Sequence, residues 1–99
     1  MVKVLDSEDF DDRLRAIVDD FGFKLIVDGW SVKCYDIYHV SAREDHDLIA
    51  RIDSNSFISG KVFVYDDRAF DFAIKAAELL EKDFESVKEA SVVRADKPV

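Results

Sequence analysis

The pattern of apolar positions predicts two amphipathic helices, one near each end of the chain. Within 7–21, apolar residues recur at the three- and four-residue spacing of a single helix face, and they are Phe10, Leu14, Ile17, Val18 and Phe21. The same spacing recurs within 68–84, at Phe70, Ala73, Ile74, Ala77, Leu80 and Phe84. Each helix therefore has one apolar stripe to bury against another element of the fold.

The ends of both predicted helices carry residues that start or stop helices. Asp6 or Ser7 is expected to cap the first helix, because these side chains accept hydrogen bonds from the free N–H groups of a first turn. Gly22 suits the left-handed position that ends a helix. The second helix is expected to start from a cap at Asp66 or Asp67.

Between the helices, β-type residues flank the dipeptide Asp28-Gly29, which is a preferred two-residue type I′ hairpin turn. A turn of that length fixes the register of its two strands. The predicted opposite pairs are Val27 with Trp30, Leu25 with Val32 and Phe23 with Cys34. All six side chains are apolar and are expected to face the core, so Cys34 is interpreted as a small buried hydrophobic residue rather than a nucleophile.

Alternating or apolar segments predict the rest of a sheet. The second strand continues through 35–40, a third spans 46–53 and a short one spans 61–65. The apolar phase shifts near Asp36, which indicates a β-bulge or a strand that is partly covered on both faces. Short connections between these strands favour antiparallel pairing.

The C-terminal tail has two interpretations. From residue 85 it is expected to extend the second helix and fray near Ala95, because no glycine interrupts it; an edge strand at 91–94 is the alternative. The order of elements predicts an α+β fold in two layers, helix–antiparallel three- or four-stranded meander–helix. With 99 residues, 1–99 is expected to be a single domain.

Composition narrows the class of protein. The chain has 14 Lys and Arg against 22 Asp and Glu, a formal net charge of −8, which argues against free nucleic acid or an anionic membrane as the partner. No apolar run approaches the ~20 residues that span a bilayer, and no signal peptide is recognised. The single cysteine excludes an internal disulfide. A cytoplasmic protein is therefore expected.

Motifs that carry chemistry are missing from the sequence. The segment 53–55 starts like a calcium-binding loop, but Phe57 and Ile58 then occupy positions that need a ligand and a glycine. Three glycines in all do not form a phosphate-binding loop. We therefore expect no metal, no cofactor and no catalytic residues.

The acidic residues are concentrated in two blocks. Residues 1–22 hold seven acids against three bases, and residues 44–67 hold six against two. The predicted partner-binding residues are Asp9, Asp12, Asp19 and Asp20 on the outward face of the first helix, and Glu44, Asp45, Asp47 and Asp53 in the middle block. Asp19 and Asp20 stand in the last turn of a helix, where the helix dipole favours cations.

The order of elements, together with the acidic charge, resembles that of small phage-encoded inhibitors, including anti-CRISPR proteins that block Cas9 by mimicking DNA. The segments 35–40 and 48–52 are also similar to those of small phage proteins. The resemblance covers architecture and charge over residues 7–84. It implies a non-catalytic, stoichiometric binder that occupies the basic, nucleic-acid-binding surface of a partner protein such as a Cas nuclease.

Two alternatives to a specific acidic binding surface stay open. The acids also suit a plain role in solubility. A structural or assembly protein would self-associate through a sheet edge, or through an apolar patch of Tyr35, Ile37, Ile26 and Phe63 on the second face of the sheet. The protein is expected to be a monomer or a weak dimer, and a small enzyme is the least favoured interpretation.

Overall fold

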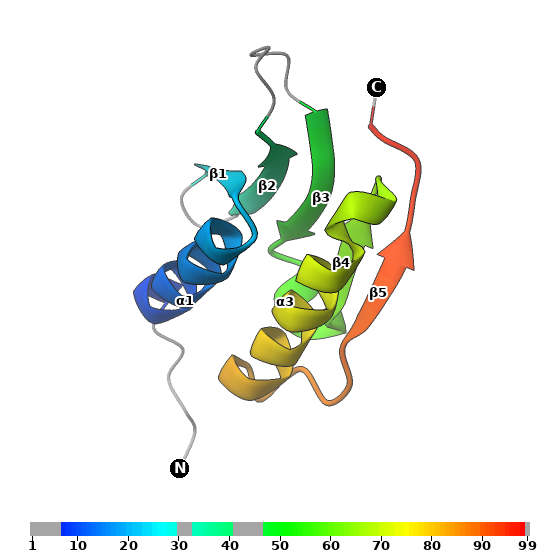
Figure 1. The fold of residues 1–99 in the computed structure, drawn as a ribbon. Coiled ribbons are helices and arrows are strands. Elements are labelled where there is room, and N and C mark those ends of the chain that lie inside the picture. The colour runs from blue at the N-terminus through cyan, green and yellow to red at the C-terminus, as the bar shows by residue number, and fades with distance from the viewer. Residues whose placement is uncertain (1–6, 30–32, 41–46, 99) are drawn as a thin grey trace.

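The computed structural model describes residues 7–29, 33–40 and 47–98, and arranges them as helices on a five-stranded sheet (Figure 1). The elements in chain order are α1 (Ser7–Asp20), β1 (Phe23–Asp28), β2 (Cys34–His39), β3 (Asp47–Asp53), α2 (Ser56–Ser59), β4 (Lys61–Val64), the 3₁₀ turn η1 (Asp67–Ala69), α3 (Phe70–Asp83) and β5 (Ser91–Arg94). The strand order is β1-β2-β3-β4-β5, antiparallel throughout except for the parallel pair β4 and β5. The predicted α+β class is confirmed, with five strands instead of three or four.

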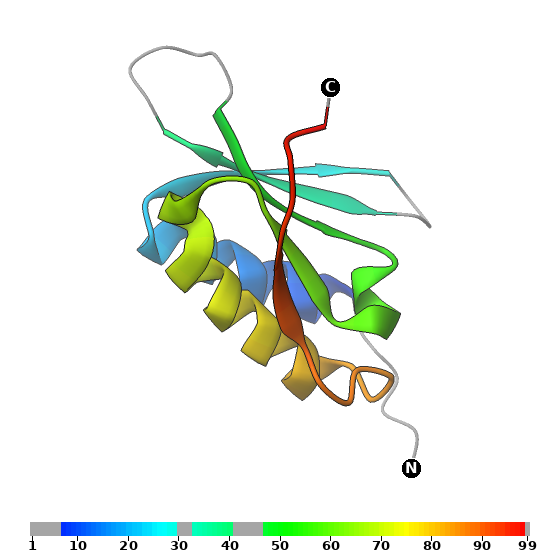
Figure 2. The same ribbon diagram turned by 90° about the vertical axis from the view of Figure 1, so that its right-hand side faces the viewer.

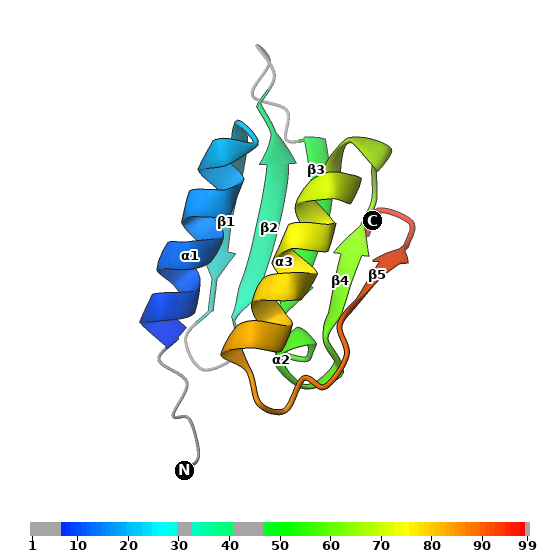
Figure 3. The ribbon, with the colours of Figure 1, turned by 60° about the horizontal axis from the view of Figure 1, so that its bottom comes forward.

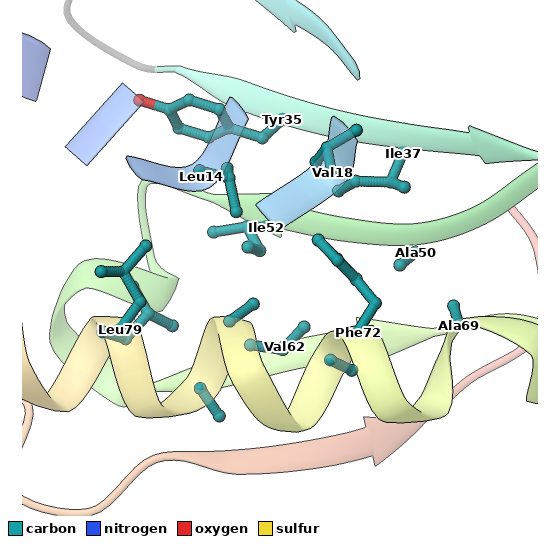
Figure 4. Close-up of a cluster of buried hydrophobic side chains, with 14 of the residues drawn as sticks. Leu14, Val18, Tyr35, Ile37, Ala50, Ile52, Val62, Ala69, Phe72 and Leu79 are labelled. Carbon is teal, nitrogen blue, oxygen red and sulfur yellow. The ribbon is translucent and has the colours of Figure 1, made fainter. Parts of the chain in front are cut away.

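The long helices α1 and α3 cover the same face of the sheet, which gives the fold two layers (Figures 2 and 3). Between the layers, Leu14 and Val18 of α1 meet Tyr35 and Ile37 of β2 and Phe72 of α3 (Figure 4). All five side chains are buried. None of the helices in the part of the chain that the structure describes is long and apolar enough to cross a lipid bilayer.

Both long helices begin and end close to the predicted residues. α1 ends at Asp20, and Gly22 follows it in the left-handed conformation with φ +72°. The turn η1 precedes α3, and the carboxylate of Asp66 accepts a hydrogen bond from the backbone N–H of Arg68 at 2.9 Å. The predicted cap is therefore confirmed at Asp66, one 3₁₀ turn before the α-helix begins.

The predicted two-residue hairpin turn is wrong. Asp28 of β1 lies opposite Cys34 of β2, so residues 29–33 form the connection between the strands. This register turns Tyr35 and Ile37 toward the helices, where both are fully buried. Burial of two large side chains outweighs the local preference of a turn dipeptide, because each is worth roughly 1.5–3 kcal/mol.

The changed register also moves Cys34. Its side chain faces away from the helices and is partly buried, so the prediction that it belongs to the core is wrong. Gly29 keeps the positive φ that a turn needs, at +94°. Trp30 and Val32, which the two-residue turn would have placed in the core, lie outside the described residues.

The pairing of β2 with β3 contains a bulge, but β2 keeps a regular alternation because it pairs residue by residue with β1. The pairing of β2 with β3 shifts between Ile37 and Tyr38, so that Ile49 of β3 is the extra residue. Ile49 is fully buried. The bulge is therefore close to the predicted position, but the inserted residue belongs to the neighbouring strand.

The C-terminal tail forms a strand, so the predicted helical extension is wrong. α3 ends at Asp83, and Phe84 is already extended with φ −122° and ψ 112°. β5 then runs parallel to β4 with Val92 beside Val62. Phe84 and Val87 are buried in the connection. Burying these two side chains requires the chain to leave the helix, although no glycine or proline marks the point.

The connection from β3 to β4 is the single-turn helix α2, which ends at Gly60 in the left-handed conformation with φ +71°. The segment that leads into β5 lies directly against this glycine. A Cβ atom at Gly60 would be 2.7 Å from Val87 Cγ1 and 2.9 Å from the backbone Cα of Ala90. Two constraints, backbone conformation and space, therefore require glycine here.

Gly60→Ala is expected to lower the free energy of unfolding by about 2–4 kcal/mol, because left-handed strain adds to the overpacking against Val87. Gly22→Ala is the matched control, since Gly22 has the same φ but nothing within 4 Å of an added Cβ. It is expected to cost only about 1–2 kcal/mol. Urea unfolding of both variants measures the difference, and equal losses would contradict the close packing at Gly60.

Candidate acidic binding surface

Four exposed carboxylates follow the outward side of α1. Asp9, Asp12, Asp19 and Asp20 are all exposed, on the side of the helix opposite the buried Phe10, Leu14 and Val18. We call these four residues the acidic ridge. Within the described residues, no side-chain hydrogen bond or ion pair involves Asp12, Asp19 or Asp20. The placement predicted for this half of the site is what the structure has.

Two other charged side chains of α1 form ion pairs or hydrogen bonds with the rest of the fold. Arg13 Nη1 lies 2.9 Å from Oδ2 of the buried Asp83 in α3, and this pairing raises the pKa of the arginine. Asp11 accepts hydrogen bonds from Lys33 Nζ at 3.1 Å and from the Tyr35 hydroxyl. Arg13 is itself exposed and interacts with Asp9, and Arg15 is a second exposed base of α1. The ridge therefore keeps a net negative charge.

Asp47, predicted to bind a partner, is engaged within the fold. Lys97 Nζ lies 2.7 Å from its Oδ1, and Arg68 forms a second ion pair with its Oδ2. Lys97, and then Arg68, hold the pKa of Asp47 below its ordinary value. Arg68 is shared with Asp66, whose Oδ2 lies 2.8 Å from Nη2. Local cations therefore compensate the charge of Asp47.

Asp53, another predicted partner-binding residue, supports the turn that follows β3. Its Oδ1 accepts hydrogen bonds from the backbone N–H of Ser56 at 3.1 Å and from the Ser56 hydroxyl at 3.3 Å. Asp47 and Asp53 stand at opposite ends of β3, roughly 20 Å apart. Glu44 and Asp45 lie outside the described residues. The described part of the middle block therefore does not form one surface.

The face of the sheet that the helices leave uncovered carries an ion pair that sequence reasoning missed. Asp36 and Arg51 are opposite each other on β2 and β3. Arg51 Nε lies 2.5 Å from Asp36 Oδ1, and its Nη2 lies 3.2 Å from Oδ2. Only 6 % of Asp36 is exposed. Opposite charges in two strands signal a pair only once the register is known, and the sequence predicted no register for β2 with β3.

Two of the four residues predicted to form an apolar patch on this face lie on the other face of the sheet. Tyr35 and Ile37 are fully buried on the helix side of the sheet. Ile26 and Phe63 do lie on the uncovered face, in one row with Asp36 and Arg51, and both are partly buried. The centre of this face is thus an ion pair between two apolar side chains, not a continuous apolar surface.

Cys34 is expected to react slowly with alkylating reagents. Burial, followed by the negative charge of Asp36, raises the pKa of the Cys34 thiol to about 11. At pH 8 roughly one thiol in a thousand is then ionised, and iodoacetamide should react on the order of 100-fold more slowly than with a free cysteine. Asp36→Asn is expected to speed the reaction by removing one cause. Alkylation at the rate of free cysteine would contradict the environment described.

Comparisons with known proteins leave the site to be interpreted from its own chemistry. No family model, no curated protein and no solved structure matches the chain. In the ranges 7–29, 33–40 and 47–98, no group of three or more His, Cys, Asp or Glu side chains is arranged to hold a metal ion. The acidic ridge is consequently the candidate binding site of the described residues.

Proposed function

We propose that this protein is a non-catalytic acidic module that occupies the basic, nucleic-acid-binding surface of a partner protein, such as a Cas nuclease. Its carboxylates would stand where that partner binds phosphates. The observation that supports this proposal is the acidic ridge, with four exposed carboxylates on one side of a helix. By contrast, Asp47, Asp53 and Asp83 are engaged by cations or backbone groups of the fold.

The dimensions of the ridge suit a short stretch of nucleic-acid backbone. An α-helix rises about 1.5 Å per residue, so Asp9 and Asp20 are roughly 16 Å apart along the axis of α1. One strand of B-form DNA carries about five phosphates over that length, at one per ~3.4 Å. Four carboxylates on a rigid helix therefore approach the charge density of one strand of DNA.

The position of Asp19 and Asp20 supports a specific role over a general role in solubility. The last turn of α1 contains no basic residue. Two carboxylates there oppose the helix dipole, which costs roughly 0.3–1 kcal/mol each. Charges needed only for solubility are placed at lower cost elsewhere on the surface. The unfavourable placement is accounted for if a partner contributes the missing cations.

The proposal is tested by the salt dependence of binding and by competition with DNA. A guide-loaded Cas9-type nuclease is the first partner to measure, with duplex DNA as the competitor. The dissociation constant is expected to rise at least about tenfold between roughly 50 and 200 mM salt, and DNA is expected to displace the protein. Binding that ignores ionic strength, or that persists under saturating DNA, would count against phosphate mimicry.

A further inference from the structure

β1 is an edge strand whose outer side has no neighbouring strand among the described residues. It pairs only with β2 and stands first in the sheet (Figure 3). Its two charged side chains, Lys24 and Asp28, are exposed, and its four apolar side chains are only partly buried. A six-residue edge of this kind is a template for a further strand.

The hydrogen bonds of β4 fix which backbone groups face which neighbour. The N–H of Tyr65 donates to the carbonyl of Ile49 at 2.8 Å, while the carbonyl of Val64 accepts from Ala95 on the β5 side at 2.9 Å. Odd-numbered positions of β4 therefore bond to β3, and even-numbered positions bond to β5. By the same alternation, Arg51 directs its backbone groups to β4.

The alternation continues across β2 to the free edge. The residues of β3 on either side of Arg51 bond to β2, so Asp36 of β2 is left to bond to β1. Its partner there is Ile26. The backbone N–H and C=O groups of Leu25 and Val27 consequently point away from the sheet, and these are the groups that an added strand would bond.

This alternation limits how β1 can pair with β1 of a second copy. In an antiparallel pair, outward residues must lie opposite outward residues, so one strand can slide along the other only in steps of two. When Ile26 lies opposite Ile26 of the second copy, Lys24 lies opposite Asp28 on both sides of the two-fold axis. Leu25 then lies opposite Val27, on the face where both pack against the core. The centred register thus forms two ion pairs and two apolar pairs.

The other registers that this rule allows are less favourable. A slide of two residues places Lys24 or Asp28 opposite Ile26 and loses both ion pairs. A slide of four residues places Lys24 opposite Lys24, or Asp28 opposite Asp28, and like charges directly opposite are destabilising. The other edge strand, β5, has four residues with Arg94 as its single charge, so two copies of β5 form no ion pair between them. The charges of β1 therefore favour a second copy of β1 in one register.

On this basis we infer that the protein forms a homodimer in which β1 pairs antiparallel with β1 of a second copy, with Lys24 opposite Asp28 at both ends. The two sheets then continue as one sheet, with five strands from each copy. The two-fold axis stands perpendicular to that sheet, so the helices of both copies cover the same face. This dimer does not depend on the proposed function of the acidic ridge.

The net charge of −8 on each copy opposes association, but the charges near the contact are close to balance. Arg13 reaches from α1 to Asp83 of α3. Asp9 and Asp20 share this flank of α1, so they lie away from the edge of β1. Arg15 lies on the flank nearer β1, and the two charges of β1 cancel. Salt screens exposed charges that are farther apart than ~8–10 Å.

The dimer is expected to be weak, because one pair of six-residue strands forms a small interface. A dissociation constant on the order of 10–100 µM at about 150 mM salt is expected, and sedimentation equilibrium measures it. A protein that remains monomeric at a concentration of about 1 mM overturns the inference.

Charge reversal tests the two ion pairs. K24D and D28K each convert both attractive pairs into repulsive ones, so each is expected to weaken association at least about tenfold. The double variant K24D/D28K exchanges the charges and should restore association to within about threefold, and a mixture of the two single variants should associate as well. K75D and D71K make the same changes in net charge at exposed positions of α3, and they should leave the dissociation constant within about twofold. Single variants that associate like the wild type, or a double variant that stays as weak as they are, overturn the inference.

Cysteine crosslinking reads the register directly. In the inferred dimer Ile26 lies on the two-fold axis as a non-hydrogen-bonded pair with a Cα–Cα distance of about 4.5 Å, which suits a disulfide. Ile26→Cys, made together with Cys34→Ser, is expected to form an intermolecular disulfide on mild oxidation. Lys24→Cys in the same background is the control, since its two copies would be four residues, roughly 13 Å, apart along the strands. Crosslinking at position 24 but not at 26 overturns the register, and crosslinking at neither overturns the pairing of β1.

Discussion

Neutralising the acidic ridge in two halves is expected to weaken partner binding equally but to change stability in opposite directions. D9N/D12N and D19N/D20N each remove two negative charges from α1 and replace them with a side chain of similar size and helix propensity. Each pair should raise the dissociation constant at low salt roughly tenfold or more, and the four-residue variant should lose most of the salt dependence.

The stability effects differ because the two pairs stand at opposite ends of the helix. Asp9 lies in the first turn of α1, where the helix dipole favours a negative charge, whereas Asp19 and Asp20 lie in the last turn. D19N/D20N is therefore expected to raise the free energy of unfolding by about 0.5–2 kcal/mol, and D9N/D12N is expected to lower it slightly. Urea unfolding measures this sign, and binding is measured on the same samples.

The control removes two charges from a different helix. Asp71 and Glu78 are exposed acids of α3, so D71N/E78Q produces the same change in net charge away from the ridge. It should leave the affinity within about twofold of the wild type, because exposed charges farther than ~8–10 Å are screened at physiological salt. If this variant weakens binding as much as the ridge variants, the partner senses total charge and the ridge is not a specific site.

Phe10→Ala is expected to be among the most destabilising substitutions in the chain. Phe10 is 1 % exposed, and its ring meets Tyr35, Phe57 and Phe84 edge-to-face at centroid distances of 5.6, 5.4 and 5.2 Å. It thus joins α1 to β2, α2 and the end of α3. Truncation should lower the free energy of unfolding by about 3–5 kcal/mol, a large part of the ~5–15 kcal/mol that holds a domain folded.

Phe70→Ala serves as the control for this loss. Phe70 is 36 % exposed at the start of α3, and the guanidinium of Arg94 lies 5.3 Å from its ring centroid. Losing that contact and the partial burial should cost about 1 kcal/mol. Denaturant unfolding measures both losses in the free energy of unfolding, and the dependence of that free energy on denaturant concentration should stay the same in both variants. A smaller loss for Phe10→Ala than for Phe70→Ala would mean that the aromatic cluster does not anchor α1 to the sheet.

The spacing of apolar residues predicted the helices well, because the residues that form one face of a helix lie within a few turns of each other in sequence. Phe10, Leu14 and Val18 repeat every four residues, and all three are buried. The cap at Asp66 and the stop at Gly22 depend on hydrogen bonds and φ values that involve near neighbours only. The same locality made the four carboxylates of α1 predictable as one exposed surface.

The register of β1 with β2 and the existence of β5 were not predictable in this way. Both depend on packing against residues that are far away in sequence. The dipeptide Asp28-Gly29 favours a two-residue turn, yet Tyr35 and Ile37 enter the core and force a longer connection. β5 forms because Phe84, Val87 and Val92 pack against the hydrophobic core, most of which comes from earlier segments of the chain.

The sequence by itself determined the class of fold, the two long helices, the cap at Asp66, the stop at Gly22 and the acidic face of α1, since each follows from spacing and charge along one segment. Only the tertiary structure decided which acids stay available. Asp47 and Asp53 were both predicted to bind a partner, but the fold engages them: Lys97, fifty positions away, pairs with Asp47, and the turn at Ser56 bonds Asp53. Among the described residues, β1 has a free edge because the strand order places it first in the sheet, and that order depends on contacts between distant segments.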